Sequence, residues 1–382
     1  MTLKLSRRAF IPPFIAMDVL REANERAVLG EDILHLEVGQ PSTPAPEGVL
    51  RAAESALRQD VIGYTDACGL PALREAIARH YRNQYGVIVD PARVVVTTGS
   101  SAGFILAFLA AFDAGDRVAL AAPAYPAYRN ILATLDLVPV ELEAGPADHF
   151  QATEDLVRAC KDKIAGIIVA SPANPTGSML DVAEVDALAR YCEAEGIRLI
   201  SDEIYHGICY GKEAATAIRS SDQAIIVNSF SKYYSMTGWR IGWMIVPPDM
   251  VRSIECLAQN LFISAPTLSQ FAAMAAFDCG DELDGNVRRY AQNRALLLEE
   301  LPKAGITNFA PADGAFYLYA DIANLTNDSQ EFCRRMLREI GVACTPGVDF
   351  DRGRGHTSLR FGYAGETDAI AEAVRRLKQW LR

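Results

Sequence analysis

The chain has 382 residues, half of them hydrophobic, and a formal net charge of −11. A chain of this length can bury a large core and typically divides into two domains. The acidic balance argues against a surface for nucleic acid or anionic membrane, because both need a basic patch. The longest apolar run, from Phe104 to Phe112, is far shorter than a membrane span.

The N-terminal segment and the cysteines favour the cytoplasm. The prolines of Ile11-Pro12-Pro13-Phe14 interrupt the chain before the apolar core of a signal peptide forms. Eight scattered cysteines lack Cys-x-x-Cys spacing, which predicts buried free thiols rather than disulfides or a metal site. We therefore expect a cytoplasmic protein without a metal.

From about residue 90, short β-branched runs alternate with helical patterns. Strands are predicted at residues 94–97, 117–121, 164–170, 198–201, 224–228 and 241–246, with helices at 153–160 and 182–195. Continuous Val/Ile runs separated by helices are typical of strands buried on both faces. The pattern predicts a mainly parallel (mixed) sheet flanked by helices.

The pattern changes at about residue 281. A charged helix (283–301), a strand (314–319), a helix (329–340), a strand (358–363) and a terminal helix ending at Leu381 predict an α+β unit. The first 45 residues are rich in proline and show no strand ladder of their own. We expect an α/β protein with a large domain (46–280) and a smaller α+β domain from both chain ends (281–382, with 1–45 packing against it).

Polar residues follow the predicted strands, where ligands bind in open parallel sheets. Ser100 and Ser101 open a helix whose amino end suits a phosphate, although they also suit a plain N-cap. Tyr125 follows the next strand and suits either stacking on an aromatic ring or core packing. Asn174, in the Pro/Gly-rich segment 171–177, can donate to a phenolate oxygen or bond its own backbone.

Two further strand ends carry charged side chains. Asp202 ends a strand, where its carboxylate can pair with a pyridinium or cap a following helix, and Tyr205 lies about one helical turn later. Lys232 follows Ser229-Phe230-Ser231, and Arg240 comes eight residues after it. An amine for a carbonyl, a guanidinium for a phosphate and a carboxylate are what a pyridoxal-phosphate enzyme needs.

In order along the chain, these motifs resemble the class I/II pyridoxal-phosphate aminotransferases of fold type I. The resemblance covers about Gly39 to Arg360 and rests on three motifs: Ser-Pro-Ala-Asn-Pro-Thr-Gly (171–177), Ser-Asp-Glu-Ile-Tyr (201–205) and Ser-Phe-Ser-Lys through Gly242. It implies that Lys232 forms the internal aldimine with pyridoxal 5'-phosphate and then moves the proton. It also implies that Asp202 pairs with the pyridine nitrogen, while Tyr205 and Asn174 bond the phenolic oxygen.

The resemblance assigns further residues to cofactor and substrate. Tyr125 takes the ring-stacking position, and the phosphate is held by Ser229, Arg240 and the backbone groups of Ser100, Ser101 and Ala102. Arg360 clamps the substrate α-carboxylate, a task that suits the planar fork of arginine, and Gly39 lies near that carboxylate. Tyr64 reaches the phosphate of the partner subunit, which implies a homodimer with a shared active site. The Asn174–Pro175 peptide bond is expected to be cis.

The substrates implied are an amino acid and a 2-oxo acid, and the residues leave their identity open. Several aspartate-type relatives carry a lysine where this chain has Ser101. Apolar residues (Ile11, Phe14 and 261–266) suit either the pocket of a neutral or aromatic donor or plain core packing. Aspartate stays an alternative, since Arg7, Arg8 or Arg21 can supply charge. A lyase acting by β-elimination or ring closure shares the cofactor residues. A non-catalytic pyridoxal-binding regulator would need a DNA-binding extension, for which there is no room before Gly39.

Overall fold

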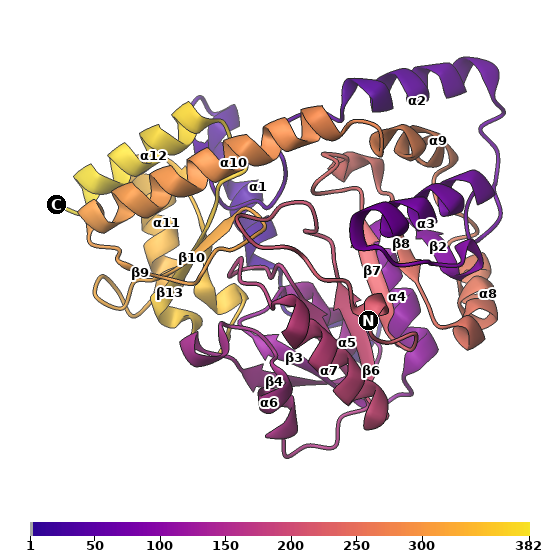
Figure 1. Cartoon of the computed structure of the whole chain (residues 1–382). Coiled ribbons are helices and arrows are strands. Elements are labelled where there is room, and N and C mark those ends of the chain that lie inside the picture. Colours follow the sequence, from indigo (N-terminus) through magenta and orange to yellow (C-terminus); the bar gives the residue numbers. More distant parts are fainter. Residues whose placement is uncertain (1–2) are drawn as a thin grey trace.

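A seven-stranded sheet forms the centre of the structure, a computed structural model that describes residues 3–382 (Figure 1). Its strands run in the order β2-β8-β7-β6-β5-β3-β4. Neighbours pair in parallel except at β8, which is antiparallel to both β2 and β7. The strands are β2 (Val94–Thr97), β3 (Arg117–Ala122), β4 (Val138–Glu143), β5 (Gly166–Ala170), β6 (Arg198–Asp202), β7 (Ile225–Ser229) and β8 (Gly242–Ile245). The predicted mainly parallel, mixed sheet is confirmed.

Helices cover both faces of this sheet, as the Val/Ile runs predict. On β2, Val94 and Val96 pack into one core with α3, α7 and α9, while Val95 packs into the opposite core with α4, α5 and α8. The helices are α2 (Glu47–Gln59), α3 (Pro71–Tyr85), α4 (Gly99–Ala111), α5 (Pro126–Thr134), α6 (Glu154–Arg158), α7 (Val182–Ala194), α8 (Val251–Leu261) and α9 (Thr267–Ala276).

Strand β4 was not predicted. It lies at the sheet edge, where β3 is its one partner among residues 3–382. It carries Pro139 and alternating charged residues rather than a continuous apolar run. Proline is tolerated in edge strands because one side of the strand needs no ladder hydrogen bonds. A search for strands buried on both faces therefore misses it.

The C-terminal part forms a second, four-stranded antiparallel sheet in the order β12-β13-β10-β9. Helices α10 and α12 lie side by side next to it (Figure 1). The elements are β9 (Asn308–Phe309), β10 (Tyr317–Asp321), β12 (Thr345–Pro346), β13 (Ser358–Gly362), α10 (Gly280–Glu300), α11 (Ser329–Ile340) and α12 (Thr367–Trp380).

The N-terminal segment contacts this C-terminal part. Helix α1 (Ile15–Val28) is followed by the short strand β1 (Leu34–His35), which pairs in parallel with β11 (Val342–Ala343). Strand β1 is completed by a partner about 300 residues away, so it belongs to no ladder formed within the first 45 residues and has no local signature. The division into domains 1–45, 46–280 and 281–382 stays a prediction. Within residues 3–382, no helix combines the length and the apolar character needed to cross a bilayer.

Candidate active site

A cavity of about 400 Å³ lies where the carboxyl ends of the central strands meet the N-terminal and C-terminal segments. Most of the residues predicted for cofactor and substrate line it: Gly39, Ser100, Ser101, Tyr125, Asn174, Asp202, Tyr205, Lys232, Arg240 and Arg360. Ala102, Ser229 and Tyr64 do not line it. The structure thus gathers predicted residues from position 39 to position 360 into one cavity.

The sheet topology explains this gathering. Strands β2, β3, β5, β6 and β7 all point the same way, so their carboxyl ends share one edge of the sheet. Asp202 is the last residue of β6, Tyr125 follows β3, and Asn174 follows β5. The Asn174–Pro175 peptide bond is cis, as expected.

Asp202 is buried, with 3% of its surface exposed, and burial raises the pKa of its carboxyl to about 6. Its oxygens accept hydrogen bonds from the Tyr128 hydroxyl and from the backbone N–H of Ile204, the latter at 3.0 Å. Residues 204–207 form a turn rather than a helix, so the alternative role of Asp202 as a helix cap does not apply, and Tyr205 reaches the cavity from a turn. Asp202 is thus a carboxylate held by two donors.

Tyr128 was missed by sequence reasoning. Burial and the neighbouring Asp202 raise the pKa of its phenol well above the usual value, so the hydroxyl stays protonated and donates. The available signal was its position on α5, three residues after Tyr125, with which its ring packs edge to face at 5.3 Å.

Lys232 carries an amine that is easily deprotonated. Its Nζ donates a 2.6 Å hydrogen bond to the backbone oxygen of Gly39. Burial, and then the positive charges of Arg360 and Arg240, lower the pKa of Lys232 to about 8, against the opposing effect of Asp202. Near neutral pH this lysine therefore reaches the free-amine form far more readily than a solvated lysine.

Arg360, on β13, presents a fixed guanidinium to the cavity. It is 2% exposed and lies between the rings of Tyr317 and Phe350, at 4.5 and 4.8 Å from their centroids. Its Nη1 donates to Asn174 Oδ1 at 2.8 Å, and its Nη2 donates to Thr345 Oγ1 at 3.1 Å and to the backbone oxygen of Glu37. Because Asn174 accepts through Oδ1, its NH₂ group is left to donate elsewhere.

Tyr317, on β10, is a second residue that the sequence did not single out. Its hydroxyl lies 2.7 Å from the hydroxyl of Tyr205. A Cβ atom at position 39 would lie 1.7 Å from this hydroxyl oxygen, so only glycine fits there. The signal in the sequence is the segment Gly-Ala-Phe-Tyr-Leu-Tyr (314–319), in which Tyr317 and Tyr319 fall two residues apart on a predicted strand.

The amino end of α4 and Arg240 lie against each other. Gly99, with φ of +71°, begins α4, and a Cβ atom there would lie 2.4 Å from Arg240 Nη2. Ser231 lines the cavity, whereas the buried Ser229 hydroxyl donates to Ser231 Oγ at 2.9 Å. Ser229 therefore supports Ser231 in this structure. Free N–H groups of a helix amino end next to a guanidinium favour a phosphate group.

Comparisons with known proteins agree with this geometry. The family model described as "Aminotransferase class I and II" matches residues 31–377. The valine–pyruvate aminotransferase of Mycobacterium tuberculosis is 49% identical, over 100% of this chain and 99% of its own length. This chain belongs to the class I and II aminotransferases. The aspartate aminotransferase of Geobacillus stearothermophilus is 31% identical over 99% of both chains. A crystal structure of an aminotransferase from M. tuberculosis superposes with a TM-score of 0.97 at 49% identity, covering 100% of this chain and 99% of that one.

Class I and II aminotransferases depend on pyridoxal phosphate, and the residues present fit this cofactor. The cavity volume suits a small-molecule site. Its donor set combines an amine of lowered pKa, a buried carboxylate and the cationic pair formed by the α4 amino end and Arg240. The residues that would hold the cofactor are Ser100, Ser101, Tyr125, Asn174, Asp202, Tyr205, Ser231, Lys232 and Arg240.

Three sequence-based assignments lie apart from the cavity of this aminotransferase chain. Tyr64 is 84% exposed, and neither Ile11 nor residues 261–266 contribute to the cavity wall. The apolar wall is built by Phe14, Met17 and Leu20, so only Phe14 of the predicted wall residues takes part. Ile11 precedes α1, where its side chain faces outward and is 49% exposed.

Proposed function

We propose that this pyridoxal-phosphate-dependent aminotransferase takes a neutral, branched amino acid as donor, with valine as the first candidate and pyruvate as the acceptor. The wall of Phe14, Met17 and Leu20 on one side of the cavity carries the proposal of a neutral, apolar donor, and the 49% identical valine–pyruvate aminotransferase of M. tuberculosis supports the choice of valine and pyruvate. An apolar wall favours an aliphatic side chain by about 0.8 kcal/mol per buried CH₂ group.

The charges around the cavity argue against aspartate as the preferred donor. Among the described residues, the cations that line the cavity are Lys232, Arg240 and Arg360, and all three have tasks at the cofactor or the α-carboxylate. Arg8 pairs with Asp136, and Arg21 pairs with Glu25 at 3.1 Å on the exposed face of α1. A carboxylate on the donor side chain would therefore lack a dedicated partner, which is costly in a buried site.

We assign the catalytic tasks as follows. The bound cofactor supplies a carbonyl carbon that combines with amines and a ring that withdraws electrons from the substrate Cα. Asp202, whose two donors oppose the effect of burial on its pKa of about 6, would hold the ring nitrogen of the cofactor in its protonated form. Arg360 would bind the α-carboxylate of the substrate and orient its Cα–H bond. Asn174 would donate a hydrogen bond from its NH₂ group to the phenolic oxygen of the cofactor. With the cofactor bound, Lys232, with its lowered pKa, would be the base that takes the proton from the substrate Cα and the acid that returns it.

We propose that the working unit is a homodimer with a shared active site and that Tyr64 serves the phosphate of the partner subunit. Tyr64 is highly exposed in the single chain, and the exposed apolar side chains of Val61, Ile62, Leu261 and Ile263 accompany it. The segment that contains Tyr64 contacts the start of α9, where the Thr267 hydroxyl donates to the backbone oxygen of Gly63. Light scattering should give the mass of two chains, and Tyr64→Phe should weaken cofactor retention. A fully active monomer would contradict this part.

We propose a cytoplasmic location. It is supported by the eight cysteines, which are all free thiols, and four of them are buried. Free thiols persist in a reducing compartment. Fractionation of cells that produce the chain, with marker enzymes as controls, would test this location, and recovery from an extracellular fraction would contradict it.

A donor screen tests the proposed function. Purified holoenzyme is given valine, leucine, alanine, phenylalanine or aspartate as donor, with pyruvate and 2-oxoglutarate as acceptors, and both products are quantified. We expect valine and other neutral donors to give the highest kcat/KM with pyruvate. A preference of a hundredfold or more for aspartate would overturn the substrate assignment. Release of ammonia without a new amino acid would indicate a lyase.

A further inference from the structure

Helix α1 begins without a side-chain cap of its own. Its N-cap position is Phe14, whose side chain offers no hydrogen-bond acceptor. The cap comes from Asp349, more than 330 positions later, whose two carboxylate oxygens accept from the backbone N–H groups of Ile15 (3.1 Å) and Ala16 (3.0 Å). A carboxylate at this end satisfies unpaired donors and interacts favourably with the helix dipole. Asp349 is 1% exposed, so little water competes for it.

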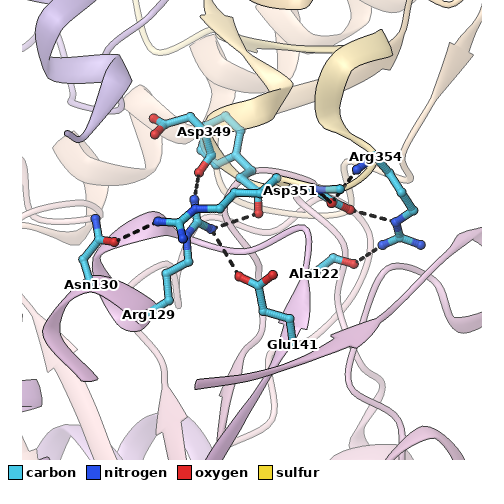
Figure 2. Close-up of polar contacts among 10 residues, drawn as sticks. Ala122, Arg129, Asn130, Glu141, Asp349, Asp351 and Arg354 are labelled. Atoms are coloured by element: carbon cyan, nitrogen blue, oxygen red, sulfur yellow. Dashed lines mark hydrogen bonds and ion pairs between the residues drawn. The ribbon is translucent and has the colours of Figure 1, made fainter. Parts of the chain in front are cut away.

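The segment that carries Asp349 is fixed in turn to the large sheet. Figure 2 shows the buried guanidinium of Arg129, on α5, among the polar groups of this segment. Arg129 donates to the backbone oxygens of Asp349 and Phe350, the latter at 3.2 Å, and lies 3.8 Å from Glu141 of β4. The backbone N–H of Ala124 also donates to Phe350 at 3.1 Å. Asp349 is thus tied to α5, which carries Tyr128 and begins directly after Tyr125.

The helix held by Asp349 supplies the apolar wall of the cavity. Phe14, Ala16, Met17 and Leu20 all line the cavity, and the ring of Phe14 packs edge to face on Tyr125 at 5.6 Å. On the exposed side of α1, one turn beyond Met17, Arg21 pairs with Glu25 in solvent, whereas Ala23 packs with Leu337 and Ala343 of the C-terminal part. Phe14, Ala16 and Met17 lie in or next to the first turn of α1, so the position of this part of the wall depends on how that turn is held.

We propose that Asp349, anchored by Arg129, is a positioning residue for substrate specificity. By capping α1 it holds Phe14, Met17 and Leu20 at the distance that suits a branched donor side chain. The inference rests on the proposed function and deepens it, because it concerns how the donor side chain is selected. Donors without a sizeable side chain do not reach this wall, so their binding should not depend on Asp349.

The test compares Asp349→Ala and Asp349→Asn with a matched control, Asp328→Ala. Asp328 caps α11 through two backbone N–H groups, both at 3.1 Å, and α11 contributes nothing to the cavity wall. Each holoenzyme is mixed with valine or alanine alone, and the spectral change of the cofactor gives the apparent Kd and the limiting rate. The donor-only reaction avoids the problem that alanine and pyruvate are interconverted.

We expect Asp349→Ala to weaken valine binding roughly tenfold, the scale of a lost helix cap. The apparent Kd for alanine should change less than threefold, and the limiting rates with both donors should stay unchanged. Asp349→Asn should fall between, because one acceptor oxygen survives, and it carries the test if the alanine variant does not fold. Hydrogen exchange of the apoprotein should speed up at residues 15–20 in the Asp349 variants and not in Asp328→Ala.

Different failures have different meanings. A wild type that binds valine no better than alanine contradicts the proposed function. A wild-type preference for valine that survives Asp349→Ala contradicts the present inference alone. Equal weakening of both donors, or the same weakening in Asp328→Ala, would mean that Asp349 acts only on overall stability and would overturn the positioning role.

Discussion

Replacing Arg360 by lysine should damage the use of every donor to a similar extent. The side chain of Arg360 is fixed between two rings and by bonds to Asn174 and Thr345, so its remaining N–H groups meet an α-carboxylate in one geometry. Lysine keeps the charge, but it offers a single ammonium group and cannot stack in the same way.

The magnitude follows from what lysine loses. A hydrogen bond to a charged group contributes about 1.5–3 kcal/mol, and the contacts with the two rings contribute about 0.5–2 kcal/mol. The Arg360→Lys variant also leaves Asn174 Oδ1 without its donor, at a cost of about 1 kcal/mol or more. Together these terms predict a loss of about 3–6 kcal/mol, or roughly 150- to 25,000-fold in kcat/KM.

The assay is steady-state kcat/KM for valine, alanine and aspartate, measured with wild type and Arg360→Lys under one set of conditions. Circular dichroism and the cofactor absorbance check that the variant is folded and loaded. A loss confined to aspartate, with the neutral donors spared, would show that Arg360 binds the donor side chain, and the assignment to the α-carboxylate would be wrong.

Three further results follow from the site. The Asp202→Ala variant should keep the cofactor, because the phosphate contacts survive, but its kcat should fall roughly a hundredfold or more. Absorbance measures the bound cofactor and steady-state turnover measures kcat. A near-native rate would mean that Asp202 has a purely structural role. Because the pKa of Lys232 is lowered to about 8, its neutral fraction rises as the pH passes through 8. The rate at which apoenzyme recombines with pyridoxal phosphate should climb from pH 7 to 9 and then level off, whereas a plateau reached only above pH 10 would mean an ordinary lysine. Gly39→Ala should displace Tyr317 at a cost of about 1–3 kcal/mol in stability, and an unchanged Tm and kcat/KM would contradict this close contact.

The sequence predicts well those features that local pattern controls. Asn174, Asp202 and Lys232 each follow a recognisable strand, so the parallel topology brings them to one edge without further information. The burial of β2 on both faces could likewise be predicted from its consecutive valines.

Features that depend on distant partners could not be predicted in this way. Nothing near Phe14 indicates that a carboxylate at position 349 caps the helix that follows it. Tyr317 and Tyr205 meet only when the C-terminal sheet packs on the turn after β6. Strand β1 exists because of a backbone partner about 300 residues away. Each of these contacts belongs to tertiary packing, which propensity and periodicity do not encode.

The central claim is that Lys232 is the amine that joins the cofactor in this aminotransferase. Treating the purified yellow holoenzyme with borohydride fixes the cofactor on the amine that holds it, and peptide mapping by mass spectrometry then identifies that residue. The expected result is one modified peptide, with the added mass on Lys232 and none in a Lys232→Ala control. Modification of a different lysine in the wild type, or a purified protein that retains no pyridoxal phosphate when supplied with it, would contradict the account.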